Sequence, residues 1–187
     1  MSYDTPLEAH EHAEHAAHAQ DPFTGRVSIT IAILAVLAAA SGSLESVEAG
    51  KAITSSSEAV LKQDQATDNW GVSNSKAARK NLYVIAATEF PAKADAFGKA
   101  QAKNDQDEAK SREKALDFEK ERDKLLAQSR AHEDRHHWLT AAATLVEVGI
   151  AISTVAIITR RRSFWIASIL LGLIGCGLLA LTYLPIA

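Results

Sequence analysis

The most informative part of this chain is residues 138–183, which read WLTAAATLVEVGIAISTVAIITRRRSFWIASILLGLIGCGLLALTY. Two apolar blocks, 138–159 and 164–184, stand on either side of three consecutive arginines, Arg160 to Arg162. Each block has about the 20 residues that a helix needs to cross a hydrocarbon core about 30 Å thick. Because lysine and arginine gather in the short cytoplasmic loops of membrane proteins, the arginine turn predicts two transmembrane helices joined on the cytoplasmic side.

A third apolar block lies near the start of the chain. Residues 27–44 read VSITIAILAVLAAASGSL and contain no charged side chain. The block follows an acidic, histidine-rich tail, residues 1–26, where a signal peptide would carry basic residues, so we expect a retained transmembrane helix. With the arginine turn in the cytoplasm, three crossings place the N-terminus in the cytoplasm and put residues 45–137 and the C-terminus outside. In a bacterium this corresponds to the inner membrane, with the outside parts in the periplasm.

The composition of the chain narrows the classes of function. Its 187 residues carry 20 Lys plus Arg against 23 Asp plus Glu, a formal net charge of -3. The basic residues alternate with acidic ones, so we expect no nucleic-acid partner. The one cysteine, Cys176, lies in the last apolar block and excludes an intrachain disulfide. A single soluble enzyme domain is disfavoured, because apolar residues are concentrated in the three predicted spans.

Residues 45–137 are rich in Ala, Lys, Glu, Asp and Gln and poor in β-branched residues, which favours helix. Pro91 lies near the middle and removes an amide donor, so we expect a break there. The predicted fold class is all-α, with three transmembrane helices and a long extramembrane antiparallel helical hairpin. In the first arm Trp70, Ala77 and Val84 recur every seven residues and form a narrow seam. We expect this seam to join arms of different copies; the alternative is a bent, solvated hairpin that stands alone.

Two features inside the predicted spans indicate contacts between helices. Glu147 lies near the middle of the second block, where an ionised carboxylate costs at least about 3 kcal/mol and is usually turned toward a partner or protonated. We expect the acid to form an interhelical hydrogen bond in a homo-oligomer; the alternative is a channel or transporter with a proton or cation path lined by Glu147, Ala143, Ala151 and Thr154. In the third block, small residues recur every four positions and predict a packing surface between copies: Ser168, Gly172, Cys176 and Ala180.

The histidines raise the question of a zinc site. His132 and His136 belong to an H-E-x-x-H pattern, which on a helix places two imidazoles on one face. No third ligand follows at a suitable spacing, so we expect a juxtamembrane helix end and not a hydrolytic centre. In the tail, His12 and His15 share a helical face with neighbouring glutamates and form a second candidate metal site. The favoured interpretation of both is a polar segment without a cofactor; the alternative is a metal-binding protein.

Four stretches of the chain carry a family resemblance. They are the head HEHAEHAAH (10–18), the first apolar block (27–44), the segment QATDNWGVSNSKAARKN (65–81), and the block from His136 to Gly175. In these stretches the chain resembles a family of bacterial membrane proteins, domain of unknown function 4337. The resemblance implies a membrane protein and no known activity. Because the sequence also contains no catalytic signature, we expect a non-enzymatic scaffold or accessory subunit in the lipid bilayer, as a homo-oligomer or within a larger membrane complex.

Overall fold

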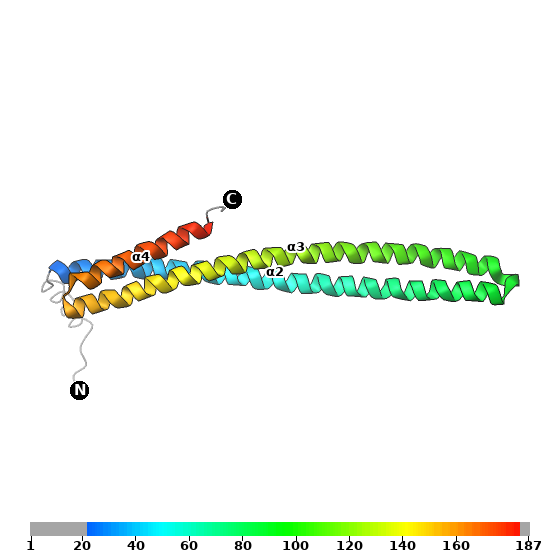
Figure 1. The fold of residues 1–187 in the computed structure, drawn as a ribbon, viewed down its shortest axis with the longest axis horizontal. Coiled ribbons are helices and arrows are strands. Elements are labelled where there is room, and N and C mark those ends of the chain that lie inside the picture. The colour runs from blue at the N-terminus through cyan, green and yellow to red at the C-terminus, as the bar shows by residue number, and fades with distance from the viewer. Residues whose placement is uncertain (1–21, 184–187) are drawn as a thin grey trace, which may run out of the picture. The chain divides into compact units, whose positions relative to one another are not determined.

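The computed structural model describes residues 22–183, which form three α-helices and one short 3-10 helix (Figure 1). No strand occurs in these residues, so the predicted all-α class is confirmed. Each of the three α-helices contains a stretch that is long and apolar enough to cross a membrane. The elements are α2 (Pro22–Glu89), η1 (Pro91–Lys93), α3 (Ala94–Thr159) and α4 (Arg162–Tyr183).

The ends of the helices follow the prolines and the arginine turn. α2 begins at Pro22. Proline has no backbone N–H, but an N–H at the first helical position has no acceptor within the helix, so no hydrogen bond is lost there. α2 ends just before Pro91, because proline disfavours a helical conformation at the residue that precedes it. That residue, Phe90, has φ −125° and ψ 74°, outside the helical region. Between α3 and α4, Arg160 takes φ 51°, the left-handed conformation that ends many helices.

The helices do not stop at the predicted membrane boundaries. The hydropathy pattern predicts residues 27–44 and the first hairpin arm as separate segments, whereas both belong to α2. The second arm and residues 138–159 likewise both belong to α3, and α4 begins at Arg162, ahead of the predicted start at residue 164. Backbone hydrogen bonds in a helix are local, so an alanine-rich helix continues where only the hydrophobicity of its side chains changes.

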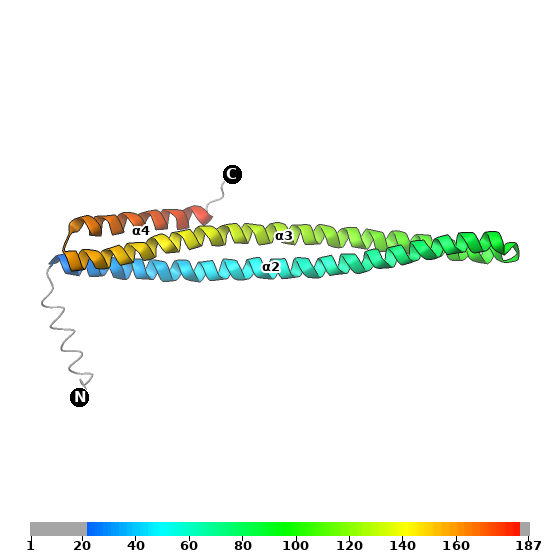
Figure 2. The same ribbon diagram turned by 60° about the horizontal axis from the view of Figure 1, so that its bottom comes forward.

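The chain divides into two compact units, which we describe separately. The bundle unit comprises the described residues 22–48 and 134–183, and the hairpin unit comprises residues 49–133. The bundle unit holds the start of α2, the end of α3 and all of α4, and α4 lies beside α3 in both views (Figures 1 and 2). The hairpin unit holds the rest of α2 and α3, which are connected through η1.

Glycines let the helices of the bundle unit approach closely. A Cβ atom at Gly175 of α4 would lie 2.7 Å from Val146 Cγ2 and 3.0 Å from the Ala142 carbonyl oxygen, both on α3. A Cβ atom at Gly172 would collide with the Leu34 side chain of α2. Small residues at such positions are typical of helix packing in membranes, where close backbone contact replaces the hydrophobic effect as the source of stability.

Buried hydroxyl groups also connect the helices of the bundle unit. The Ser153 hydroxyl of α3 donates a hydrogen bond to Ser168 Oγ of α4 at 2.8 Å, and both side chains are fully buried. The Trp165 indole of α4 donates to Thr30 Oγ1 of α2 at 3.0 Å. These bonds satisfy polar groups within the unit and connect α4 to each of the other two helices.

The hairpin unit is held by a seam of small residues. Ala59, Ala66 and Ser73 recur every seven residues on α2 and are buried, as are Asn104 and Ala115 on α3. Residues seven apart occupy the same side of a helix, so these positions form one continuous line of contact. Their short side chains allow the two arms to pack closely along that line.

The seam that the sequence predicts between copies lies beside this buried line and stays a prediction. Trp70 and Ala77 are half-buried, and Val84 is 45% exposed. The Trp70 indole donates a hydrogen bond to Glu119 Oε1 of the opposite arm at 2.9 Å, so this tryptophan serves the hairpin itself. Tryptophan and valine stand out in a hydropathy pattern, whereas the alanines and serine that fill the seam do not.

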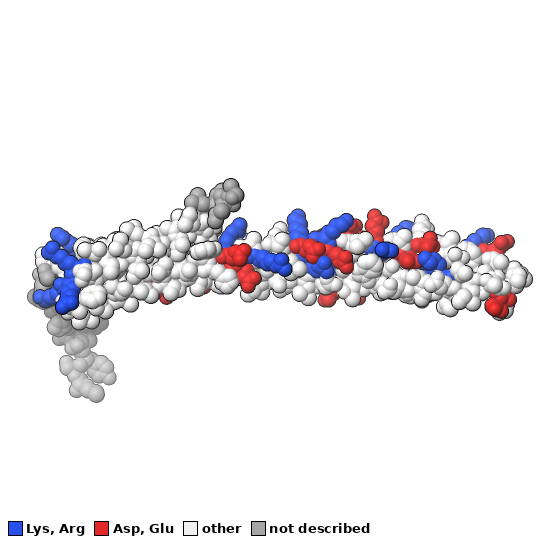
Figure 3. All heavy atoms as spheres, viewed as in Figure 1, with Lys and Arg blue, Asp and Glu red and all other residues white. Residues whose placement is uncertain are grey.

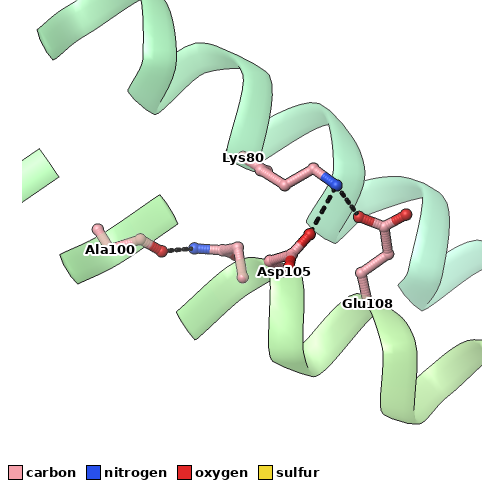
Figure 4. Close-up of polar contacts among 5 residues, drawn as sticks. Lys80, Ala100, Asp105 and Glu108 are labelled. Atoms are coloured by element: carbon pink, nitrogen blue, oxygen red, sulfur yellow. Dashed lines mark hydrogen bonds and ion pairs between the residues drawn. The ribbon is translucent and has the colours of Figure 1, made fainter. Parts of the chain in front are cut away.

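Ion pairs join the two arms beside this seam. The Lys80 ammonium lies 2.6 Å from Glu108 Oε2 and 2.9 Å from Asp105 Oδ1 (Figure 4). The hydrogen bond to Glu108, followed by that to Asp105, raises the pKa of Lys80 above its ordinary value of 10.5. One turn away, the Lys76 ammonium lies 2.8 Å from Asp107 Oδ2, and this hydrogen bond lowers the pKa of Asp107 below 3.8. Each such surface pair contributes little free energy. Together they place opposite charges next to each other in this register of the two arms.

Candidate functional site

One face of α3 in the bundle unit is exposed along its length and carries the acid Glu147. Thr144, Glu147, Ala151 and Thr154 follow one another at steps of three, four and three residues, and all four are exposed. This spacing places side chains on one side of a helix. We call these four residues the Glu147 stripe.

The opposite face of α3 is the one that packs within the unit. Val146 and Ser153 are at most 1% exposed, and Ala143 is 7% exposed. Glu147 therefore points away from the other helices of its own chain. Ala143, which the alternative prediction of a path groups with Glu147, lies on the buried side, because four residues along a helix return a side chain only roughly to the same face.

The Glu147 carboxyl has no partner within the described part of the chain, where no side chain donates a hydrogen bond to it or forms an ion pair with it. The neighbouring hydroxyls are occupied as donors: Thr144 donates to the Thr140 carbonyl oxygen at 2.8 Å, and Thr154 donates to that of Ile150 at 3.1 Å. Their oxygens can still accept. A protonated carboxyl could therefore donate to such a hydroxyl, or to a second carboxyl, supplied by another molecule.

The small-residue stripe of α4 is used largely inside the chain. Ser168 and Gly172 are buried against α3 and α2, Cys176 is half-buried, and Ala180 is exposed. The first two residues therefore contact the chain's own helices, and the role of the stripe in packing between copies stays a prediction. The sequence shows that a close helix contact exists at such a stripe but does not show which helix makes it.

A polar cluster joins α2 and α3 at the other end of the bundle unit's apolar stretch. The Thr140 hydroxyl donates to Glu45 Oε1 at 2.6 Å, and His136 Nδ1 lies 3.8 Å from the same oxygen. Arg135 lies 3.7 Å from Glu48, whose side chain is only 4% exposed. The sequence analysis missed this cluster, although its signal is visible: the acids directly follow the first apolar block, and the basic residues directly precede the second.

The candidate zinc ligands do not gather into a metal centre in the described residues. Within 22–183 there is no group of three or more His, Cys, Asp or Glu side chains suited to hold an ion. His136 lies beside Glu45, and its ring stacks at a tilt with that of His137, 5.7 Å between centroids. His12 and His15 lie outside the described residues.

Comparison with known families agrees with the resemblance seen in the sequence. The family described as Domain of unknown function (DUF4337) matches residues 23–185. The chain belongs to this family. No curated protein and no solved structure matches it. The function of this DUF4337 protein must therefore be argued from the surfaces of its helices, and the Glu147 stripe is the part of those surfaces that the chain's own packing does not explain.

Proposed function

We propose that this DUF4337 protein is a non-enzymatic, membrane-integral scaffold whose copies associate through the Glu147 stripe. The observation that carries the proposal is the exposed, unpartnered carboxyl in the middle of an apolar stretch of α3.

The surface of the bundle unit suits lipid. Large apolar side chains are exposed on all three of its helices, including Ile33 (57%) on α2, Ile158 (77%) on α3 and Leu173 (63%) on α4. A water-soluble protein seldom exposes so much contiguous apolar surface, because its contact with water is unfavourable. In a bilayer the same side chains face hydrocarbon, and the backbone groups of each helix are satisfied internally.

An acid that faces hydrocarbon needs a partner. Exposure of an ionised carboxylate at the bilayer centre costs about 3 kcal/mol or more, which is a large part of the stability of a small membrane domain. Because Glu147 faces away from its own chain, folding alone does not relieve this cost. Association with another molecule through the same face would relieve this cost, because it supplies hydrogen-bonding groups and removes the acid from lipid.

A second copy of the same chain is the partner that suits the stripe. Two facing acids can share a hydrogen bond when one of them is protonated, so the residue is complementary to itself. Ala151 on the same face is small and permits close approach, and the Thr144 and Thr154 hydroxyls can accept further hydrogen bonds. Identical surfaces meeting about a twofold axis are the commonest way in which proteins form oligomers.

The hairpin unit offers a second surface of the same kind. Val60, Thr67, Asn74 and Asn81 recur every seven residues on the outer side of α2, and all are exposed and uncharged. On the face shown in Figure 3, charged side chains gather over α3, whereas much of α2 is free of them. We propose that arms of neighbouring copies meet along this uncharged stripe, which takes the place of the predicted seam at Trp70, whose indole bonds within its own hairpin.

The proposed location is a bacterial inner membrane, with the arginine turn in the cytoplasm and the hairpin tip in the periplasm. It is supported by the concentration of arginine in the turn, since basic loops remain on the cytoplasmic side. In a variant without Cys176, a cysteine at Ala92 should react with a membrane-impermeant maleimide in intact spheroplasts, and one at Ser163 should not. Labelling of Ser163→Cys alone would reverse the orientation.

The mass of the purified protein in lipid nanodiscs or mild detergent tests the association. We expect the wild type to be an oligomer, Glu147→Leu to be mainly monomeric, and Glu147→Gln to retain association because an amide still forms hydrogen bonds. Leu173→Ala, which alters a lipid-facing residue of α4, is the matched control and should leave the mass unchanged. A monomeric wild type, or an oligomer that Glu147→Leu leaves intact, would refute the proposal.

A second candidate function is a proton or cation path between copies. It is supported by the Thr144 and Thr154 hydroxyls, which lie on the same exposed face as the acid. A proton or cation path requires water between the copies, whereas a scaffold does not. Flux through proteoliposomes that falls to background in Glu147→Gln would favour the path, whereas equal flux in wild type, Glu147→Gln and empty liposomes would leave the scaffold alone.

A further inference from the structure

Four arginines gather at one end of the bundle unit. Arg160, Arg161 and Arg162 form the turn from α3 into α4, and Arg26 lies near the start of α2; all four side chains are exposed. In Figure 3, blue side chains stand together at this end of α3 and α4. We call these four residues the arginine collar.

Contacts between α2 and α4 bring the two parts of the collar to the same place. The Trp165 indole donates a hydrogen bond to Thr30 Oγ1 at 3.0 Å, and its ring meets the edge of Phe23 with centroids 6.0 Å apart. The Thr30 hydroxyl in turn donates to the Arg26 carbonyl oxygen, so Arg26 lies one turn from the contact. Arg162 precedes Trp165 by less than one turn on α4. Basic residues of two helices therefore lie within about one turn of the same aromatic contact.

No described carboxylate neutralises the collar. The described acids of the bundle unit are Glu45, Glu48, Asp134 and Glu147. Glu147 precedes Arg160 by 13 residues, which is about 20 Å along a helix, and Glu45 follows Arg26 by 19 residues, which is about 28 Å. These separations far exceed the reach of an ion pair. The four positive charges repel one another, and an anion from outside the described residues would reduce this repulsion.

We infer that the arginine collar binds the phosphate groups of anionic phospholipids. The inference rests on the proposed insertion of the bundle unit into a membrane. Tryptophan and phenylalanine at the end of a span favour the headgroup layer, so Trp165 and Phe23 place the collar at the depth of lipid phosphates. The planar guanidinium forms two parallel hydrogen bonds to a phosphate, and basic sites between helices at the cytoplasmic surface suit acidic headgroups.

The rival account gives the collar no ligand. Arginines beside a span also fix its orientation during insertion, and that role requires only positive charge and no lasting contact with one class of lipid. The two accounts differ in what the folded protein binds after it has been purified. A third outcome is that the collar binds a soluble phosphate compound in place of lipid. A titration with such a compound in the absence of anionic lipid distinguishes this outcome from lipid binding.

The test is a titration of the detergent-solubilised full-length chain with fluorescent phosphatidylglycerol, and in parallel with fluorescent phosphatidylcholine. We expect the anionic lipid to bind more tightly than the zwitterionic one. In the triple variant Arg160→Gln, Arg161→Gln and Arg162→Gln, binding of phosphatidylglycerol should weaken on the order of a hundredfold, from about fivefold for each basic residue. Inorganic pyrophosphate, titrated into protein in phosphatidylcholine nanodiscs, should show no comparable binding.

Arg26→Gln provides a variant that leaves the turn intact. It should weaken binding of phosphatidylglycerol about fivefold, whereas Arg79→Gln, an exposed arginine of the hairpin unit, should leave it unchanged. Circular dichroism of each variant shows that its helices have formed. Equal affinity of the wild type for the two lipids, wild-type affinity in both collar variants, or pyrophosphate binding as tight as that of lipid would overturn the inference.

The failure of this inference is distinguishable from failure of the proposed membrane insertion. Release of the wild-type protein from membranes by alkaline carbonate would contradict insertion itself. Retention in the membrane pellet together with equal binding of the two lipids would overturn the lipid site alone.

Discussion

The bundle unit and the hairpin unit join stretches of the same helices by different means. In the bundle unit, Gly172 and Gly175 bring the backbones together, and a buried hydrogen bond between Ser153 and Ser168 supplies the polar contact. In the hairpin unit, alanines such as Ala66 take the place of the glycines, and ion pairs flank the seam. Small residues create close contact in both units, but the side chains beside the contact differ between them.

On the proposed insertion of the bundle unit into a membrane, we attribute this difference to the two solvents. In water, an ion pair at the edge of a helix pair gains little free energy, because its charges are solvated in either state, but mismatched charges disfavour other registers. In lipid, an unpaired polar group is costly, so the few polar groups of a bundle are satisfied by each other. Glu147 is the exception in the bundle unit, since its own chain supplies no partner, and this is why we assign it to contacts between molecules.

The largest effect should come from filling the closest contact of the bundle unit. Gly175→Val places atoms against the Ala142 carbonyl oxygen, a backbone group that cannot move aside, and should lower the free energy of unfolding by about 3 kcal/mol. Gly177→Val is the matched control, because a Cβ atom at Gly177 has nothing within 4 Å. Thermal unfolding in detergent measures both. Equal losses in the two variants would show that α4 does not pack as described.

A smaller effect should come from the corresponding change in the hairpin unit. Ala66 is fully buried between the arms, and Ala66→Leu should lower the free energy of unfolding by about 1 kcal/mol, because two helices can separate slightly around a larger side chain. Ala109→Leu, at an exposed position of α3 in the same unit, is the control. The measurement is chemical denaturation followed by circular dichroism. Destabilisation by Ala109→Leu and not by Ala66→Leu would contradict the seam.

The smallest effect concerns pH and distinguishes the hairpin unit from the bundle unit. The pKa of Asp107 is lowered by Lys76, so its stabilisation is present above about pH 3.8 and is lost as the pH falls through the lower folded pKa. The pKa of Lys80 is raised, so its stabilisation is present below about pH 10.5 and is lost as the pH rises through the higher folded pKa.

Thermal stability of the hairpin should therefore be greatest between these limits. In Lys76→Gln the decline on the acid side should shrink, and in Lys80→Gln the decline on the alkaline side should shrink. Circular dichroism at a series of pH values provides the measurement. Unaltered profiles in both variants would show that these pairs do not contribute to the stability of the hairpin.

The helical class could be predicted from sequence because it depends on local features: three apolar blocks, an alanine-rich middle, and prolines where helices begin or end. The contacts between residues far apart in the sequence were harder to predict. The sequence does not indicate that the Trp70 indole bonds to Glu119, or that Ser168 and Gly172 pack within the chain. The predicted contacts of these residues between copies stay predictions. A stripe of small residues indicates that some helix approaches, but the identity of that helix depends on packing that periodicity does not encode.

The candidate site was accessible only in part. Glu147 could be identified from sequence alone, because a charge within an apolar block is conspicuous. The orientation of its side chain could not be identified in this way. Helical periodicity shows which residues share a face, but it does not show which face packs inward. The cluster of Glu45, His136 and Thr140 was missed because it joins residues about 90 positions apart, although both sides flank predicted spans.

The most direct test of the central claim, that copies meet through the Glu147 stripe, is oxidative cross-linking of single cysteines in native membranes. In a Cys176→Ala background, a cysteine at Ala151 lies on the exposed stripe, and a cysteine at Ala143 lies on the buried side of the same helix. We expect a covalent dimer from Ala151→Cys and a monomer from Ala143→Cys. A monomer from Ala151→Cys, or equal cross-linking at the two positions, would contradict the account.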